Sequence, residues 1–208
     1  MSVARVLSTA PLESKDAKWI ALKKINWSDQ DGRQRVWECA ERKTRGTAGV
    51  DAVAIFAILR SKTNAFPLST VIIEQYRPPI DRIIVELPAG LVDEDETAED
   101  AAIRELEEET GYKAEKVVES SPIIVCDPGM SNANMKNVVV SVLMEDKMET
   151  PDSKPAEGEH IVKRVVELSN LSSELQKYEA KGFSVDARLW NFAQGYELAE
   201  RIKSGAFP

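Results

Sequence analysis

The sequence has little cysteine, little histidine and no excess of positive charge, and each shortage removes a class of function. Among 208 residues there are two cysteines and one histidine, which excludes a disulfide framework and a zinc site built on Cys and His. The formal net charge is −8, whereas a protein that binds the nucleic-acid backbone needs a basic surface. No apolar run approaches the roughly 20 residues needed to cross a bilayer. We therefore expect neither a nucleic-acid partner nor a membrane partner.

The overall composition is that of a globular chain. With 43% apolar and 30% charged residues and no low-complexity run, the chain is long enough to bury a hydrophobic core. The low cysteine content favours a reducing compartment, so we expect a cytoplasmic protein. Residues 1–12 contain one Arg and no acidic residue, which is weakly typical of a transit peptide. A mitochondrial address therefore stays open, as does a nuclear one.

Two extended stretches near the N-terminus predict a β-hairpin. Residues 18–27 and 33–44 would be its arms, and Asp31-Gly32 favours a turn because glycine tolerates the positive φ that a tight turn requires. The short glycine-containing segment 45–53 predicts a boundary, with an N-terminal extension over 1–46 and a second domain over 47–208. The alternative is that the hairpin forms an edge of the same sheet.

Five β-branched runs follow, separated by Pro, Gly and Asn, and predict strands at 53–59, 70–76, 83–88, 122–126 and 137–144. One helix lies between the third and fourth runs, and two more are predicted to open at Ser169-Asn170 and at Ser184. The last helix would end before Gly205, and its helically spaced apolar residues should lie in the core. Those residues are Val185, Leu189, Phe192, Tyr196 and Ala199. Strands interleaved irregularly with helices indicate a mixed α/β (α+β) sandwich.

The first of these helices is bounded by recognisable caps. Thr97 can cap the N-terminus, with Asp100 as the other half of a capping box, and Gly111 stands where a left-handed cap is usual. An apolar face should pack on the sheet. It consists of Ala98, Ala102, Ile103 and Leu106.

The same helix concentrates negative charge near its C-terminus. Glu105, Glu108 and Glu109 share one face because positions three and four apart are neighbours, while Glu107 points elsewhere. Like charges at this spacing each destabilise a helix by about 0.2–0.5 kcal/mol, and only Arg104 stands nearby, one position off the cluster. A bound cation is the simplest compensation, since carboxylates are hard oxygen ligands that Mg²⁺ or Mn²⁺ accepts. A solvated acidic face is the alternative for the helix taken alone.

The spacing around this helix resembles the Nudix box, the signature of the Nudix hydrolases, at every charged and glycine position. The matching residues are Gly90, Glu96, Arg104, Glu105, Leu106, Glu108, Glu109 and Gly111. The one departure is Tyr112, where the family usually has an aliphatic residue. The resemblance implies a Nudix fold, a mixed-sheet α/β/α sandwich. It also implies that Glu105, Glu108 and Glu109 bind metal together with the carbonyl of Ala89, and that Glu96 and Arg104 form a structural pair.

Further segments resemble the ADP-ribose pyrophosphatase (ADP-sugar diphosphatase) branch of the family. They are residues 74–79, 86–91, 126–132 and 185–190. In that branch N-terminal strands exchange across a homodimer and two tryptophans sandwich the adenine, which by position implies Trp19 and Trp37 rather than Trp27.

Other residues are candidates for the remainder of the substrate. Arg42 and Arg77 could hold the diphosphate or the terminal ribose, because a guanidinium offers phosphate oxygens a fixed fork of donors. Arg77 could equally be a surface residue before the turn at Pro78-Pro79. Met130 and Asn132 follow a Pro-Gly turn and could touch the terminal ribose.

The resemblance implies a Mg²⁺-dependent hydrolase, with Mn²⁺ able to replace Mg²⁺, that splits ADP-ribose into AMP and ribose 5-phosphate. Glu108 is a candidate catalytic residue, and a general base is expected on the loop 149–160, which is long enough to act as a lid. Among Glu157, Glu159 and His160 the resemblance favours Glu159. The alternatives are a hydrolase of other ADP-sugars or of oxidised nucleoside diphosphates, and a non-catalytic ADP-ribose sensor. Sensors of this fold usually lose glutamates of the box, and none is lost here.

Overall fold

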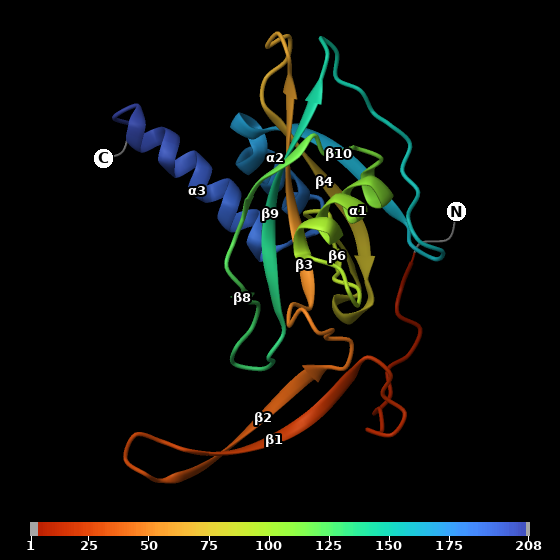
Figure 1. The fold of residues 1–208 in the computed structure, drawn as a ribbon, viewed down its shortest axis with the longest axis vertical. Helices are drawn as coiled ribbons and strands as arrows, with labels where there is room; N and C mark the ends of the chain where they lie inside the picture. Colours follow the sequence, from red (N-terminus) through yellow and green to blue (C-terminus); the bar gives the residue numbers. More distant parts are fainter. Residues whose placement is uncertain (1–3, 207–208) are drawn as a thin grey trace.

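The protein consists of an N-terminal hairpin and a larger sheet with helices on both faces (Figure 1). This computed structural model describes residues 4–206, so the first three residues of the transit-like segment 1–12 lie outside it. The hairpin pairs β1 (Ile20–Ser28) with β2 (Gln34–Arg42) in antiparallel fashion, and Gly32 has a φ of +75° in its turn. Both arms predicted from the sequence are therefore confirmed.

The large sheet contains nine strands within residues 4–206 and mixes parallel with antiparallel pairs. Its main path runs β11-β5-β4-β3-β9-β7, while β10, β6 and β8 pair with β4, β3 and β9 respectively. The central strand β3 runs parallel to β9 and antiparallel to β4. The strands are β3 (Ala52–Ser61), β4 (Ser69–Arg77), β5 (Arg82–Glu86), β6 (Ala89–Leu91), β7 (Lys116–Ser120), β8 (Ile124–Val125), β9 (Asn134–Met144), β10 (Ile161–Glu167) and β11 (Ser184–Val185). The mixed sheet predicted from the sequence is confirmed.

Two cores lie on opposite faces of this sheet because side chains of a strand alternate between its faces. From β3, Val53 and Ile55 pack towards α1 (Ala98–Thr110), whereas Ala54 and Phe56 pack towards α2 (Leu171–Ala180) and α3 (Ala187–Lys203). Short 3₁₀ turns, η1 (Pro78–Ile80) and η2 (Leu168–Asn170), precede β5 and α2. The α/β/α sandwich is therefore present, and of the helices in the described residues only α1 covers one of its faces. No helix within residues 4–206 is long and apolar enough to cross a membrane.

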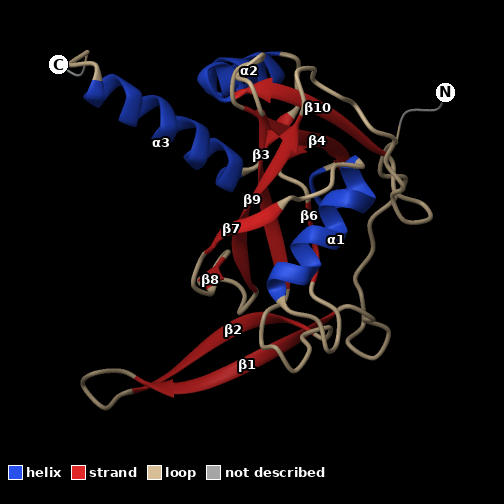
Figure 2. Ribbon diagram, turned by 45° about the horizontal axis from the view of Figure 1, so that its top comes forward, coloured by secondary structure: helices blue, strands red, loops and turns tan. Residues whose placement is uncertain are grey.

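The C-terminal helix ends before Gly205 as predicted, but it differs from its prediction at its start and in the burial of its second half. Ser184 does not begin it, because Ser184 and Val185 form β11 beside β5, and Asp186 caps the helix by accepting from the N–H groups of Arg188 and Leu189. Only the first half of α3 packs in the core, whereas Ala199 is exposed. The second half projects from the body of the molecule (Figure 2).

The acidic helix α1 follows its predicted boundaries. The Thr97 hydroxyl accepts from the Asp100 N–H at 3.1 Å, but it donates to the Asp100 carboxylate at 2.6 Å, so Asp100 does not bond the Thr97 backbone as a regular capping box would. Gly111 closes the helix with a φ of +76°, as predicted. The predicted apolar face is wrong at one position, because Ile103 is exposed and Ala101 is buried instead.

Replacing Gly111 by Ala should cost far more stability than the same change at another left-handed glycine. A Cβ at Gly111 would lie 2.2 Å from the carbonyl oxygen of Asp152, whereas one at Gly182 (φ +85°) would meet nothing within 4 Å. The left-handed conformation alone costs about 1–2 kcal/mol, so we expect about 1 kcal/mol for Gly182→Ala and more than about 3 kcal/mol for Gly111→Ala. Urea denaturation of both variants measures the difference, and equal losses would contradict the close approach at Gly111.

Candidate active site

The backbone of β6 holds two of the three clustered glutamates of α1. The Glu105 carboxylate rests against Gly90, where an added Cβ would lie 1.9 Å from the carboxyl carbon. Glu109 accepts a hydrogen bond from the N–H of Ala89 at 3.0 Å. A side chain at position 90 would therefore displace Glu105, which gives the glycine of the box a physical reason.

Arg104 connects this cluster to the loop before the helix. It donates to both carboxylate oxygens of Glu96, each at 2.9 Å, so the predicted structural pair is confirmed. Its Nη1 also donates to Glu105 at 2.7 Å and to Glu108 at 3.3 Å. Arg104, the one cation expected near the cluster, therefore does reach it, because its long side chain lets the guanidinium contact both glutamates. Glu107 instead pairs with Lys113 on the exposed side.

The cluster carries more negative charge than its protein partners neutralise. Glu109 is 4% exposed, and burial together with the charges of Glu105, Glu159 and Glu86 raises its pKa to about 8, against the opposing effect of the Ala89 N–H. Burial also raises the pKa of Glu105, although Arg104 opposes that shift. Ionised carboxylates in this position are therefore costly unless a further positive charge is present.

The chemistry of these residues fits a divalent cation. Glu105, Glu108 and Glu109 supply hard carboxylate oxygens from successive turns of one helix face, and buried Glu109 has a single hydrogen-bond donor in the described part of the chain. Within residues 4–206 they do not form a closed group of metal ligands, since Arg104 and the Ala89 N–H engage them instead. A cation bound at this face would supply the missing positive charge.

The loop between β9 and β10 is attached to the C-terminal end of α1. The Tyr112 hydroxyl donates to the carbonyl of Glu149 at 2.7 Å, the Lys154 N–H donates to the carbonyl of Glu108 at 2.8 Å, and Lys163 Nζ donates to the carbonyl of Thr110 at 2.6 Å. The first two bonds attach residues 149–154 to the end of α1, and the third attaches β10 to it, so a lid over this whole loop would have to break the first two. Tyr112 thus has a polar role that an aliphatic residue could not perform.

The second part of this loop brings Glu159 to the site. Its carboxylate accepts from the N–H of Ala156 at 3.2 Å, and its charge contributes to the raised pKa of both Glu105 and Glu109. Glu159, Glu157 and His160 are all exposed, so any of the three could contact a ligand.

The hairpin places Trp37, one of the two tryptophans expected to bind adenine, beside the loop segment that contains Met130. Trp37 donates from its indole N–H to the carbonyl of Gly129 at 2.9 Å, and the Ala40 N–H donates to the carbonyl of Met130 at 2.9 Å. The Trp37 ring is half-exposed and the Met130 side chain is exposed. Both side chains are therefore available to a ligand on the same surface.

Trp19 lies at the other end of the hairpin. In the register of β1 and β2, Trp37 faces Ile25, whereas Trp19 precedes Ile20, which faces Arg42. Six residues along a strand correspond to roughly 20 Å, so Trp19 and Trp37 of one chain cannot sandwich one ring. Arg42 is exposed near Trp19, at the end of β2.

Arg77 is held by a buried glutamate that the sequence analysis did not identify as a site residue. Glu86 is 3% exposed and accepts from Arg77 Nε at 2.8 Å. Burial raises the pKa of Glu86, and the charge of Arg77 opposes that shift. The signal was present in the sequence, because Glu86 is a lone charge closing an apolar strand just before the box glycine.

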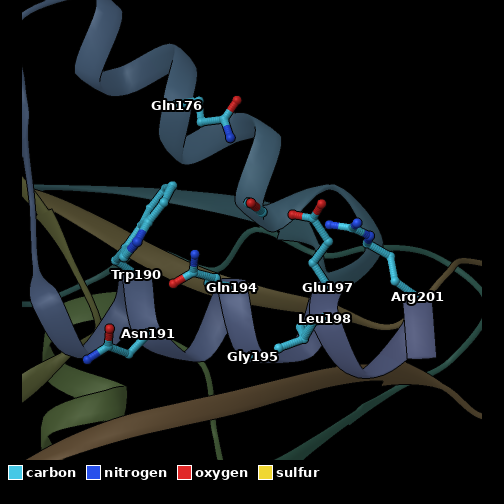
Figure 3. A pocket seen from close by; sticks show the side chains of 9 residues that line it. Gln176, Trp190, Asn191, Gln194, Gly195, Glu197, Leu198 and Arg201 are labelled. Carbon is cyan, nitrogen blue, oxygen red and sulfur yellow. The ribbon is translucent and has the colours of Figure 1, made fainter. Parts of the chain in front are cut away.

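A separate hollow of about 380 Å³ lies between α2 and α3 (Figure 3). Trp190, Gln194 and Glu197 of α3 line it together with Gln176 of α2. None of the site residues predicted from the sequence contributes to it, so its size alone does not identify it as the catalytic centre.

A mixed α/β/α sandwich in which the glutamates of an acidic helix rest against a glycine of the sheet is the arrangement of a Nudix hydrolase. The sequence profile of the NUDIX domain matches residues 49–184, and the chain belongs to the Nudix family. The chain is 39% identical over 190 residues to the ADP-ribose pyrophosphatase of Saccharomyces cerevisiae, covering 91% of this chain and 81% of the relative.

Two further comparisons agree with this assignment. The chain is 34% identical over 179 residues to the ADP-sugar pyrophosphatase of Mus musculus, covering 85% of this chain and 81% of the relative. A solved structure titled as an ADP compounds hydrolase superposes with a TM-score of 0.62 at 19% identity, covering 91% of this chain and 89% of the other. At that identity the superposition supports the fold alone.

Proposed function

We propose that this Nudix hydrolase cleaves the pyrophosphate bond of ADP-ribose to give AMP and ribose 5-phosphate, with Mg²⁺ as its cofactor and Mn²⁺ able to replace it. The observation that carries the proposal is the acidic face of α1, where buried Glu109 and partly buried Glu105 lie against β6 with too little positive charge around them. The names of the yeast and mouse relatives support the choice of an ADP-ribose or ADP-sugar substrate.

The metal would be held by Glu105, Glu108 and Glu109, with the carbonyl of Ala89 as a backbone ligand. A divalent cation there supplies charge neutralisation for the pyrophosphate oxygens and lowers the pKa of water. Glu108 is proposed as a catalytic residue as well as a ligand. Glu159 would accept the proton of the attacking water, because its carboxylate is exposed and close enough to influence Glu105 and Glu109.

The remaining candidates would bind the rest of the substrate. Trp37 offers a half-exposed ring for stacking on adenine, and Met130 stands beside it. Arg77, fixed by Glu86, would donate to the diphosphate or the terminal ribose, and exposed Arg42 is the second candidate for that role.

We propose further that the active protein is a homodimer. A sandwich of adenine by Trp19 and Trp37 needs the two rings face to face, and within one chain they are roughly 20 Å apart along the hairpin. A second chain could supply the missing ring. Residues 1–46 would then be a dimerisation and substrate-binding extension of the hydrolase domain 47–208, in a cytoplasmic protein.

A panel of substrates compared by kcat/KM tests the proposed specificity. ADP-ribose should be preferred to other ADP-sugars and to oxidised nucleoside diphosphates, since only the pocket contacts differ between them. A higher kcat/KM for another ADP-sugar would favour the broader activity, which the name of the mouse relative makes the second candidate.

Calorimetry on Glu108→Gln distinguishes an enzyme from a sensor. An enzyme should keep its affinity for ADP-ribose and lose turnover, because the substitution removes one charge from the acidic face and leaves Trp37 and Met130 in place. An ADP-ribose-binding protein without measurable turnover in the unsubstituted form would contradict the proposed activity.

A further inference from the structure

An ion pair between partly buried Arg45 and buried Asp51 joins the segment after the hairpin to the start of the central strand. Arg45 donates from Nε to Asp51 Oδ1 at 2.9 Å and from Nη2 to Asp51 Oδ2 at 2.7 Å. Asp51 is 2% exposed and immediately precedes β3. Such a two-point guanidinium–carboxylate contact fixes orientation as well as distance.

The same two residues hold the end of the loop 126–134. Arg45 Nη2 donates to the carbonyl of Asn132 at 2.6 Å. Asp51 and Asn134 bond each other twice: the Asn134 N–H donates to Asp51 Oδ2 at 3.0 Å, and the Asp51 N–H donates to Asn134 Oδ1 at 2.9 Å. The loop is thereby attached where β3 and β9 begin, at one end of the rigid sheet that supports α1.

The other side of this loop bonds β2 of the hairpin. The Asn132 N–H donates to the carbonyl of Ala40 at 3.4 Å, and Ala40 and Ser131 form a parallel bridge. Together with the indole bond of Trp37 to Gly129, these contacts make the loop the connection between the hairpin and the large sheet (Figure 2). A two-stranded hairpin is marginal by itself, so its position depends on such contacts.

We propose that Arg45 and Asp51 are positioning residues for substrate binding, whose ion pair fixes the loop 126–134 and so places Trp37 and Met130 relative to the glutamates of α1. Neither Arg45 nor Asp51 is proposed to touch the substrate. The inference rests on the proposed function, since it assigns Trp37 and Met130 to the substrate. A purely structural role for the pair would lower stability without changing the affinity of the folded enzyme.

Arg45→Gln should raise the KM for ADP-ribose about tenfold and leave kcat within about twofold, because it misplaces binding groups and leaves the glutamates unchanged. The matched control is Arg60→Gln, which breaks the Arg60–Glu115 ion pair of 2.6 Å at the far end of β3 and should leave KM unchanged. Arg45→Lys keeps the charge but loses the fork of donors, so it should raise KM by a smaller factor than Arg45→Gln does. If Arg45→Gln does not fold, Arg45→Lys takes its place in each of these measurements. An unchanged KM in the folded Arg45 variant would overturn the proposal.

Combining Arg45→Gln with Trp37→Ala tests whether the pair acts through Trp37. We expect the double variant to raise KM by clearly less than the product of the two single increases, because both changes remove the same stacking contact. A full product would overturn the inference. If Trp37→Ala itself leaves KM unchanged, the proposed role of Trp37 fails; if it raises KM while Arg45→Gln does not, only the positioning role fails.

Discussion

Glu109→Gln is expected to lower kcat at least about a hundredfold while leaving the protein folded, because it removes one charge from a proposed metal ligand. A glutamine can still accept the hydrogen bond that the Ala89 N–H donates, so the backbone arrangement should survive. Steady-state kinetics with ADP-ribose and Mg²⁺ measure the effect. Glu107→Gln is the matched control, since Glu107 lies on the same helix but pairs with exposed Lys113, and its kcat should not change.

The same substitution should raise stability when no metal is present. Because the pKa of Glu109 is raised to about 8 in the folded protein, the folded state holds a proton that the unfolded state releases near the ordinary pKa of 4.5. Folding stability is therefore lost as pH rises from about 4.5 to about 8, and the variant avoids that loss. Thermal unfolding in a chelator should show a gain for Glu109→Gln that grows over this range. A gain in stability that does not depend on pH would contradict the assignment of Glu109 as a buried metal ligand. So would a kcat of Glu109→Gln equal to that of Glu107→Gln.

Glu159→Gln is expected to lower kcat about a hundredfold with little change in KM, the usual effect of losing a general base. Glu159 is exposed, and among residues 4–206 its carboxylate accepts a hydrogen bond only from the nearby Ala156 N–H, so the substitution should leave the fold intact. The adjacent His160→Gln is the control and should keep its kcat within about twofold.

The opposite pattern would contradict this choice of base. A large loss in His160→Gln with normal turnover in Glu159→Gln would make the histidine the proton acceptor. A large loss in both would indicate that the substitutions disturb the loop 155–160 as a whole. Tyr112 and Lys154 attach the first part of this loop to α1, so that result would locate the disturbance beyond residue 154.

The parts of the fold that the sequence predicts are those governed by local rules. The caps Thr97 and Gly111 bound α1 because their side chain and backbone act within a few residues. The five apolar strand runs all belong to the sheet, because each contains enough β-branched residues to stand out from its surroundings. The Glu96–Arg104 pair was implied by the resemblance to the Nudix box rather than by a local rule.

The errors arise where tertiary contacts decide the outcome. Ser184 carries a helix-start signal, but pairing with β5 makes it part of a strand, and Asp186 caps the helix instead. The helical spacing of apolar residues in α3 continues past the point where the helix still packs on the sheet. Ala199 fits that spacing but is exposed. Strands β6 and β11 are too short to show a pattern. In β10 two charged residues, Lys163 and Arg164, interrupt the apolar run, so it lacks the continuous β-branched pattern of the strands that were predicted.

The site residues likewise divide into those that local geometry predicts and those that depend on tertiary contacts. The grouping of Glu105, Glu108 and Glu109 follows from helix geometry, which a sequence carries. The support that Glu86 provides to Arg77 and that Arg45 and Asp51 provide to the loop 126–134 depends on side chains meeting between distant strands and loops. Such contacts are not periodic, so the sequence can mark Glu86 as a charged residue in an apolar run but does not reveal its partner Arg77.

Product analysis of the purified protein with ADP-ribose tests the central claim most directly. With Mg²⁺ present, chromatography should show AMP and ribose 5-phosphate released in equal amounts, and a chelator should abolish both. Protein that releases no AMP from ADP-ribose with Mg²⁺, while it hydrolyses another nucleotide under the same conditions, would contradict the account.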